Sequence, residues 1–319
     1  MLEMNIELTE ITVVGDDDTG LLAEITSLLF EHEINIEELD QAVKDDLFRM
    51  TMHVDTTGMD CSQSELQSEL EDLCDELGVD VRIRFPSEGA QSLAVLVTKE
   101  SHCLRRLLEE HESGDLSADI DVVLGNHSDL ESLAEEYNVP FHDIGDEDGT
   151  PDEDELLRLL DDYQIDLIAL ARYIRILSPD VVFRYQNRII NVHPSLLPAF
   201  PGARAYMQAV EGGVRIAGVT AHYVTPDLDQ GPIITQRAFN VPDGATEAEL
   251  RQIGQPLEAE ALLEAIKLHL NDELMVGRGR THATGNGWQL GLPEEVDQLN
   301  PDGPTDLERA PGSSKVADD

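Results

Sequence analysis

The chain has 319 residues, with 66 acidic and 21 basic side chains and a formal net charge of −45. This charge argues against nucleic acid or an anionic membrane surface as a partner, because both are bound by clustered lysine and arginine. Hydrophobic residues make up 41% of the chain, which excludes a wholly disordered protein, and the length suggests two domains.

The first 85 residues alternate between strand and helix patterns. Apolar residues recur every second position in the expected strands and every third or fourth position in the expected helices. The pattern predicts a strand over Glu7–Val14, a helix from Leu21, strands over Ile34–Val43 and Leu47–Val54, a helix over Leu66–Leu77 and a strand over Gly78–Phe85. The order βαββαβ is ferredoxin-like.

A different pattern follows Pro86–Gln91, a segment whose composition predicts a linker. Continuous apolar runs, typical of strands buried on both faces, alternate with helix patterns. The strands are expected at 93–97, 120–124, 166–171 and 188–192, and the helices at 102–112, 129–137 and 151–163. Two more strands near 218–224 and 232–239 and a long helix near 246–270 complete a mostly parallel, Rossmann-like α/β domain.

These patterns divide the chain at 1–86, 92–280 and 281–319, the last part being an acidic, Gly- and Pro-rich tail that we expect to be mobile. The three cysteines (Cys61, Cys74 and Cys103) are too few and too scattered to predict a disulfide framework or a zinc site. The first ten residues contain no basic group, and no apolar run reaches about 18–20 residues. We therefore expect a cytoplasmic protein.

The candidate chemistry lies where a buried strand ends in Asn191 and His193. Residues two apart on a strand point to the same side, and ligands of open parallel sheets sit at the carboxyl ends of the strands. The polar turn containing Asp229, between two later strands, could bring a carboxylate back to His193. An amide, an imidazole and a carboxylate together suit general acid–base work on a carbonyl group.

Each of these residues also has a plainer interpretation. A single histidine at a strand end is more often structural than catalytic, and so is a single aspartate in a Gly-Pro turn. Taken one at a time, they support only a weak functional prediction.

Two longer segments carry a family resemblance. Residues 191–198 read Asn-Val-His-Pro-Ser-Leu-Leu-Pro, and residues 228–233 read Leu-Asp-Gln-Gly-Pro-Ile. They resemble the formyltetrahydrofolate hydrolase and transferase superfamily, which carries Asn-x-His-x-Ser-x-Leu-Pro and Leu-Asp-x-Gly-Pro-Ile. The resemblance implies that Asn191, His193 and Asp229 are the catalytic trio. It also implies a folate-binding set of Arg175, Ile176, Leu177 and Val224, which includes the end of the pterin-pocket segment Tyr173–Leu177.

Three activities share this trio: formyl transfer to water, to glycinamide ribonucleotide, or to methionyl-tRNA. The first domain favours the hydrolases, the deformylases, because its loop 16–22 and its Ile34-Asn35-Ile36 segment resemble an ACT domain, which deformylases carry there. The segments 199–206 and 124–127 also resemble deformylases.

The loop 97–104 also favours the deformylases over the ribonucleotide transferases. The ribonucleotide transferases have a Gly- and Ser-rich loop there, whose backbone N–H groups hold the substrate phosphate. In this chain the loop has no glycine, and Glu100 would repel a phosphate.

Two residues depart from the deformylase pattern. Deformylases usually have adjacent histidines at the positions of His193 and Pro194, and a histidine where Met207 stands; Pro194 is the transferase-like choice, and Met207 can equally serve helix packing. Phosphoribosylglycinamide formyltransferase therefore stays open as an alternative, and so does a catalytically silent folate or amino-acid sensor.

The resemblance implies hydrolysis of 10-formyltetrahydrofolate to formate and tetrahydrofolate, supplying formate for purine biosynthesis and balancing one-carbon folate pools. Folate is then the substrate, and neither a further cofactor nor a metal is expected. ACT domains pair and bind small amino acids, so the resemblance also implies a homo-oligomer and an effector such as glycine or methionine, unless the domain only dimerises.

The acidic residues are spread along the whole chain instead of forming one patch. At molar salt the Debye length falls to about 3 Å, which screens the self-repulsion of such a surface. We interpret the composition as adaptation to a salt-rich cytoplasm. The alternative, a surface that binds a basic partner, predicts a localised acidic patch.

Overall fold

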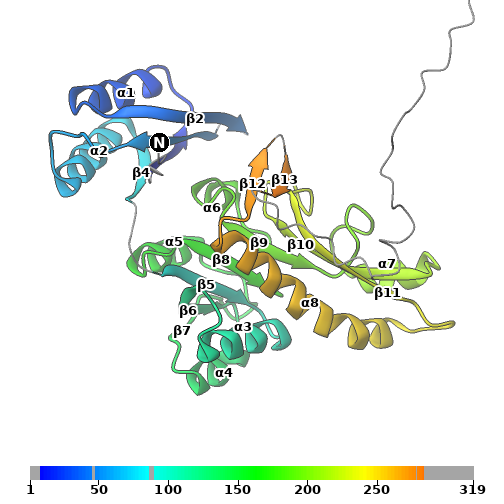
Figure 1. The fold of residues 1–319 in the computed structure, drawn as a ribbon. Coiled ribbons are helices and arrows are strands. Elements are labelled where there is room, and N and C mark those ends of the chain that lie inside the picture. The colour runs from blue at the N-terminus through cyan, green and yellow to red at the C-terminus, as the bar shows by residue number, and fades with distance from the viewer. Residues whose placement is uncertain (1–7, 45–46, 86–89, 278, 284–319) are drawn as a thin grey trace, which may run out of the picture.

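The computed structural model describes residues 8–44, 47–85, 90–277 and 279–283. These residues form an N-terminal four-stranded sheet, a seven-stranded sheet and a two-stranded hairpin (Figure 1). Among them, no helix is both long and apolar enough to cross a bilayer. The expected linker lies outside the described residues at positions 86–89, and the expected tail lies outside them from position 284 onward.

The N-terminal sheet has the predicted ferredoxin-like order. Its elements are β1 (Thr9–Asp16), α1 (Leu21–Glu31), β2 (Asn35–Lys44), β3 (Leu47–Asp55), α2 (Gln63–Leu77) and β4 (Val79–Arg84). The strands run antiparallel in the order β2-β3-β1-β4. Buried residues alternate along β3, where Phe48, Met50, Met52 and Val54 join the core beneath both helices.

The second sheet has seven strands in the order β11-β10-β9-β8-β5-β6-β7. The strands are β5 (Gln91–Val97), β6 (Ala118–Gly125), β7 (Phe141–Asp143), β8 (Leu167–Ala171), β9 (Ile189–His193), β10 (Ile216–Tyr223) and β11 (Ile233–Asn240). The five strands from β9 to β7 are parallel, whereas β10 is antiparallel to both its neighbours. The sheet is therefore mostly parallel, as predicted.

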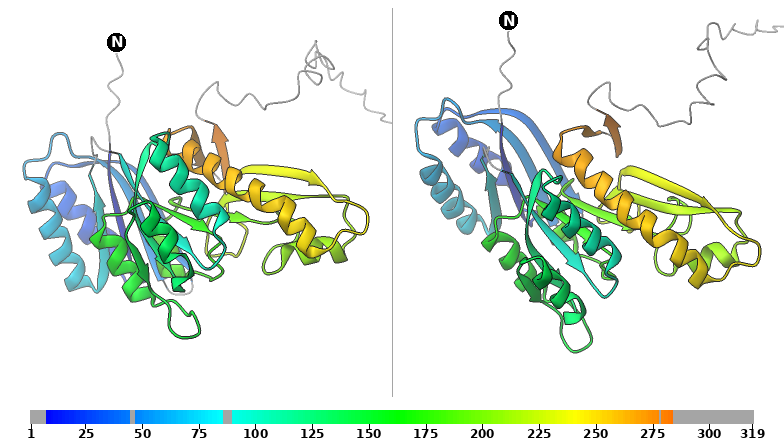
Figure 2. Two further views of the ribbon diagram at one scale, coloured as in Figure 1. Left: turned by 90° about the horizontal axis from the view of Figure 1, so that it is seen from below. Right: turned by 60° about the horizontal axis from the view of Figure 1, so that its bottom comes forward.

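Helices cover both faces of this sheet. They are α3 (His102–Ser113), α4 (Glu131–Glu136), α5 (Glu153–Asp162), α6 (Pro179–Arg184), α7 (Ala205–Glu211) and α8 (Glu247–Leu270). Val95 and Val97 of β5 face a core shared with α3, α4 and α8, whereas Ala94 and Leu96 face α5 and α6. Helices α3 and α8 lie side by side on the first face (Figure 2).

The short elements β7, α6 and α7 were not expected from the sequence. Strand β7 has three residues, and α6 and α7 have six and seven, so none spans enough residues to display a periodic pattern. The predicted helix at 129–137 is divided into a 3-10 turn (Ser128–Leu130) and α4. After α8, β12 (Leu274–Gly277) and β13 (Arg280–Ala283) form a hairpin.

Arginines join the N-terminal domain to the domain of the seven-stranded sheet. Arg188, immediately before β9, places Nη2 2.6 Å from Oε1 of Glu10 on β1, and Arg84 on β4 places Nε 2.9 Å from Oδ1 of Asp166. Burial alone would raise the pKa of Glu10, but Arg188 and then His53 hold it at about 2. The first domain thus contacts the residue that leads into the strand ending in Asn191 and His193.

Candidate active site

Strands β5, β8 and β9 lie side by side, and their carboxyl ends share one edge of the sheet. Asn191 and His193 stand two positions apart at the end of β9, so their side chains leave the strand on the same face. His193 is 5% exposed, and His222 of β10 pairs directly opposite Asn191.

Asp229 returns to this edge on the turn between β10 and β11. Its φ of 54° is left-handed, which is uncommon for a residue with a side chain and costs energy unless its surroundings impose it. Gly231 shows how closely this turn passes β10, because a Cβ there would lie 1.7 Å from the carbonyl oxygen of Tyr223. The close approach brings the carboxylate of Asp229 over the end of β9.

His193 lies between two hydrogen-bond acceptors. Its Nδ1 is 3.3 Å from Oδ2 of Asp229, and its Nε2 bonds the carbonyl oxygen of Phe200 at 2.9 Å. A carbonyl oxygen only accepts, so Nε2 carries a hydrogen, and a second proton on Nδ1 would face the carboxylate. The backbone N–H of Gly202 donates to the same Asp229 oxygen at 2.6 Å, which ties the loop after β9 to the turn.

His222 completes the cluster and was not found from the sequence. Its Nδ1 bonds the carbonyl oxygen of Tyr223 at 2.9 Å, so Nε2 can accept from Nδ2 of Asn191 at 3.2 Å. Burial is the main cause of a lowered pKa for His222, consistent with the neutral ring that this geometry requires. The available signal was a histidine near the end of a mostly apolar strand, seven residues before Asp229.

Comparisons with known proteins extend over both domains. An ACT-domain family model matches residues 9–84, and a formyl transferase model matches residues 91–266. The formyltetrahydrofolate deformylase of Haemophilus influenzae is 38% identical over 283 residues, 88% of this chain and 99% of that protein. The Bacillus subtilis deformylase is 38% identical over 83% of this chain and 90% of its own length. The chain belongs to the formyltetrahydrofolate deformylase family.

Solved structures differ in how much of this chain they match. A formyltetrahydrofolate deformylase from Pseudomonas syringae covers 88% of this chain and 96% of its own, with 29% identity and a TM-score of 0.60. Glycinamide ribonucleotide transformylase 1 from Symbiobacterium toebii covers only 62% of this chain, with 32% identity and a TM-score of 0.58. The deformylases therefore match the two-domain organisation, whereas the transformylase matches a smaller part.

The structure places the expected folate-binding residues of this deformylase-family chain in different surroundings. Leu177 is buried, and Val224 packs against the core that contains it. Ile176 is 73% exposed. Arg175 donates from Nε to the carbonyl oxygen of Gly149 and from Nη2 to that of Asp148, each at 2.8 Å. The segment is anchored by its arginine and leucine and presents an isoleucine outward.

A second cluster surrounds Glu258, which is fully buried in the middle of α8. Its carboxylate accepts from the Tyr206 hydroxyl at 2.5 Å, lies 3.1 Å from Nε2 of His102 and lies 3.2 Å from Nε of Arg172. Burial alone would raise the pKa of Glu258, but these partners, led by His102, hold it below its ordinary value. The buried carboxylate is therefore ionised at neutral pH.

Glu100 extends this cluster toward solvent. Its oxygens lie 3.1 Å from Nε of Arg172 and 2.8 Å from Nη1 of Arg251. Arg172 follows β8 directly and has a φ of 64°, so a second left-handed residue lies at this edge of the sheet. Arg172, immediately after the strand next to β9, thus contacts both the buried carboxylate of Glu258 and the outer carboxylate of Glu100.

This cluster does not suit a metal ion. Donor atoms of His102, Cys103 and Glu258 lie within 4.8 Å of one another. However, the Arg172 guanidinium already occupies the carboxylate, and burial holds the pKa of the Cys103 thiol well above its ordinary value. A cation here would be repelled by Arg172 and would need a thiolate that burial disfavours.

Proposed function

We propose that this protein hydrolyses 10-formyltetrahydrofolate to formate and tetrahydrofolate, supplying formate for purine biosynthesis and balancing one-carbon folate pools. The observation that carries the proposal is the meeting of Asn191, His193 and Asp229 at the end of β9. The similarity to deformylases over both domains supports it.

In the proposed mechanism, water attacks the formyl carbon and the carbonyl oxygen becomes an oxyanion. The N–H groups of Asn191 and His193 would stabilise that oxygen, and one such donor typically contributes about 2.7–4 kcal/mol. For this, the Nε2–H of His193 must leave Phe200 and turn to the substrate. Asp229, which faces Nδ1 of His193, would accept a proton from the attacking water and pass it to the folate nitrogen. The C–N bond then breaks as the oxyanion collapses, which releases formate and tetrahydrofolate.

His222 acts in this proposal as a positioning residue. Its neutral Nε2 occupies one N–H of the Asn191 amide, which fixes the amide's orientation and leaves its second N–H for the substrate oxygen. The folate itself would bind along the segment of Arg175, Ile176 and Leu177, with Val224 beside it. The exposed Ile176 offers apolar surface for the pterin.

Water is the favoured formyl acceptor because of Glu100. A ribonucleotide acceptor brings a phosphate, which needs positive charge or several free backbone N–H groups. The loop after β5 presents instead a carboxylate whose charge is maintained by Arg172, since Arg172 offsets the effect of burial and lowers the pKa of Glu100. Pro194, the transferase-like residue, favours the alternative activity, phosphoribosylglycinamide formyltransferase.

Saturating glycinamide ribonucleotide is expected neither to accelerate formyl loss nor to become formylated. Glu100→Gly combined with Ser101→Gly should not create transferase activity, because contacts to the ribose would still be missing. Product analysis in molar KCl checks both statements. If the wild-type protein makes formylglycinamide ribonucleotide faster than formate, the enzyme is a transferase, as Pro194 indicates, and the inference from Glu100 is wrong.

We further propose that the protein works in a salt-rich cytoplasm. The charge of −45 destabilises the folded state by self-repulsion, and molar salt screens it. The melting temperature should therefore rise strongly between dilute buffer and molar KCl, with activity lost below a few tenths molar salt and recovered on adding it back. A melting temperature that stays flat across this range contradicts the proposal.

The ACT domain is proposed to bind glycine or methionine within a homo-oligomer and to act on catalysis through the Glu10–Arg188 pair. Formate release should then change with one of these amino acids in the wild type but respond at least about tenfold less in Glu10→Gln, a loss of roughly 1.4 kcal/mol of coupling. Glu38→Gln is the matched control, because Glu38 is 76% exposed and also faces His53. An equal response in both variants, or no response in the wild type, counts against this role.

A further inference from the structure

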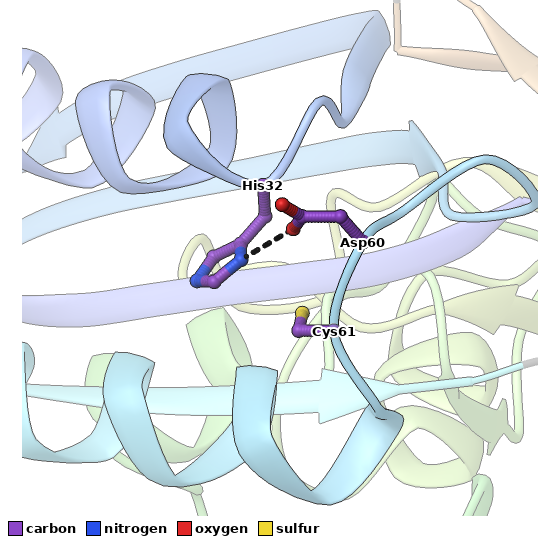
Figure 3. Close-up of side chains that lie close together, drawn as sticks. All are labelled: His32, Asp60 and Cys61. Atoms are coloured by element: carbon purple, nitrogen blue, oxygen red, sulfur yellow. Dashed lines mark hydrogen bonds and ion pairs between the residues drawn. The ribbon is translucent and has the colours of Figure 1, made fainter.

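Three side chains of types that can bind metals meet on the N-terminal domain, far from the candidate active-site residues in sequence. His32 caps the end of α1, and Asp60 and Cys61 precede α2; in Figure 3 all three point into one space between these elements. His32 Nδ1 lies 3.0 Å from Oδ1 of Asp60, and one donor atom from each residue lies within 4.8 Å of the others. Tetrahedral zinc bonds of about 2.0–2.3 Å put neighbouring donors roughly 3.3–3.8 Å apart, so small side-chain rotations suffice.

The histidine is already oriented as a metal ligand. Its second nitrogen, Nε2, lies 2.7 Å from Oε2 of Glu69 on α2. Metal-binding histidines commonly donate their other ring N–H to a carboxylate, which fixes the ring and directs the free nitrogen toward the metal. Glu69 therefore fixes the ring so that Nδ1 faces Asp60, and a metal ion would take the place of the proton on Nδ1.

The charge around these residues favours a cation. The carboxylates of Asp60 and Glu69 lie 3.0 Å and 2.7 Å from the two ring nitrogens of His32 and place negative charge beside the three donors. A divalent ion replaces the protons on nitrogen and sulfur and leaves the carboxylates compensated.

We propose that His32, Asp60 and Cys61 bind a divalent transition-metal ion of the zinc class, with Glu69 supporting His32 from the far side of the ring. One nitrogen, one oxygen and one sulfur donor suit zinc or cobalt, whereas magnesium and calcium prefer oxygen donors alone. The ion would join the end of α1 to the segment before α2, two helices that cover the same face of the sheet. A fourth position remains for water.

The second donor group of the described residues gives the proposal a control. His102, Cys103 and Glu258 meet the same distance limit, but Arg172 sits 3.2 Å from the carboxylate. At the N-terminal cluster, the charged groups that act on Cys61 are three carboxylates. An arginine contacts the carboxylate of the His102 cluster, whereas two carboxylates flank the His32 ring, and each cluster contains one cysteine.

Cobalt(II) titration of the full chain tests the site, in 1 M potassium nitrate with excess Mg²⁺ to occupy exposed carboxylates. We expect one equivalent of Co²⁺ to give intense tetrahedral bands and a thiolate-to-cobalt charge-transfer band. Cys61→Ser should abolish the charge-transfer band, and Cys103→Ser should retain it. Zn²⁺ should displace the cobalt and raise the melting temperature of the wild type.

The exposed Asp60 and Glu69 provide variants that do not depend on core packing, since their side chains are 59% and 49% accessible. Glu69→Gln should weaken Co²⁺ binding about 10–100-fold, and Asp60→Asn should weaken it at least as much. The proposal is overturned if no charge-transfer band forms, if the band survives Cys61→Ser, or if only Cys103→Ser removes it.

Discussion

Asp229→Asn is expected to reduce turnover at least about 10²-fold, the scale of one general acid–base contribution, while folate binding is largely kept. The substitution isolates charge from shape, because an asparagine oxygen can still accept the Gly202 N–H that Asp229 accepts at 2.6 Å. What disappears is the negative charge 3.3 Å from His193 Nδ1. Single-turnover formate release and equilibrium folate binding separate the two effects.

Two further variants make this test sharper. Asp227→Asn, the same change at an exposed position of the same turn, should leave turnover close to wild type. His193→Ala should be as damaging as Asp229→Asn, and the double variant should cost far less than the product of the two, because groups that act as a unit are not additive. Near-normal turnover in Asp229→Asn removes the acid–base role from this residue.

Arg172→Met is expected to lower the free energy of unfolding by about 3–5 kcal/mol, the usual cost of breaking a buried ion pair. The change leaves Glu258, which is fully buried, and Glu100 without the cation between them. Both carboxylates are ionised at neutral pH, so they would repel each other in a poorly solvated place.

Arg251→Met is the matched control, because Arg251 also binds Glu100 but is 42% exposed. Its loss should cost no more than about 1 kcal/mol. Denaturant unfolding of both variants in the same molar salt provides the comparison. Equal and small losses would mean that the Glu258 cluster is compensated by water or by His102, and that Arg172 is not its central cation.

The larger elements could be predicted from the sequence because their apolar pattern extends over enough residues to be recognised. Strand β3 alternates over nine residues, and β5 and β8 are apolar runs that only a sheet covered on both faces explains. The short helix α7 gave no such signal, although it carries Tyr206 to Glu258. Local patterns show periodicity, but they do not show which short segment reaches a partner 52 residues away.

Within the candidate site, resemblance and strand geometry indicated Asn191, His193 and Asp229, and the structure brings these three together around His222. Sequence spacing could not reveal His222, because its role depends on the antiparallel pairing of β10 with β9. The same limit applies to the proposed metal site: the scattered cysteines did not indicate it, because His32 and Asp60 lie 28 positions apart in the sequence. Contacts between segments that are distant in the chain depend on how the fold brings those segments together, so residue spacing in the sequence does not reveal them.

The measurement that tests the central proposal most directly is multiple-turnover formate release from 10-formyltetrahydrofolate in molar KCl with no amine acceptor added. Hydrolysis predicts formate and tetrahydrofolate in equal amounts over many turnovers in the wild type, and a rate at least about 10²-fold lower in Asp229→Asn. A formyl group that stays on the folate until an amine acceptor is supplied, while the folate still binds, would contradict the proposal.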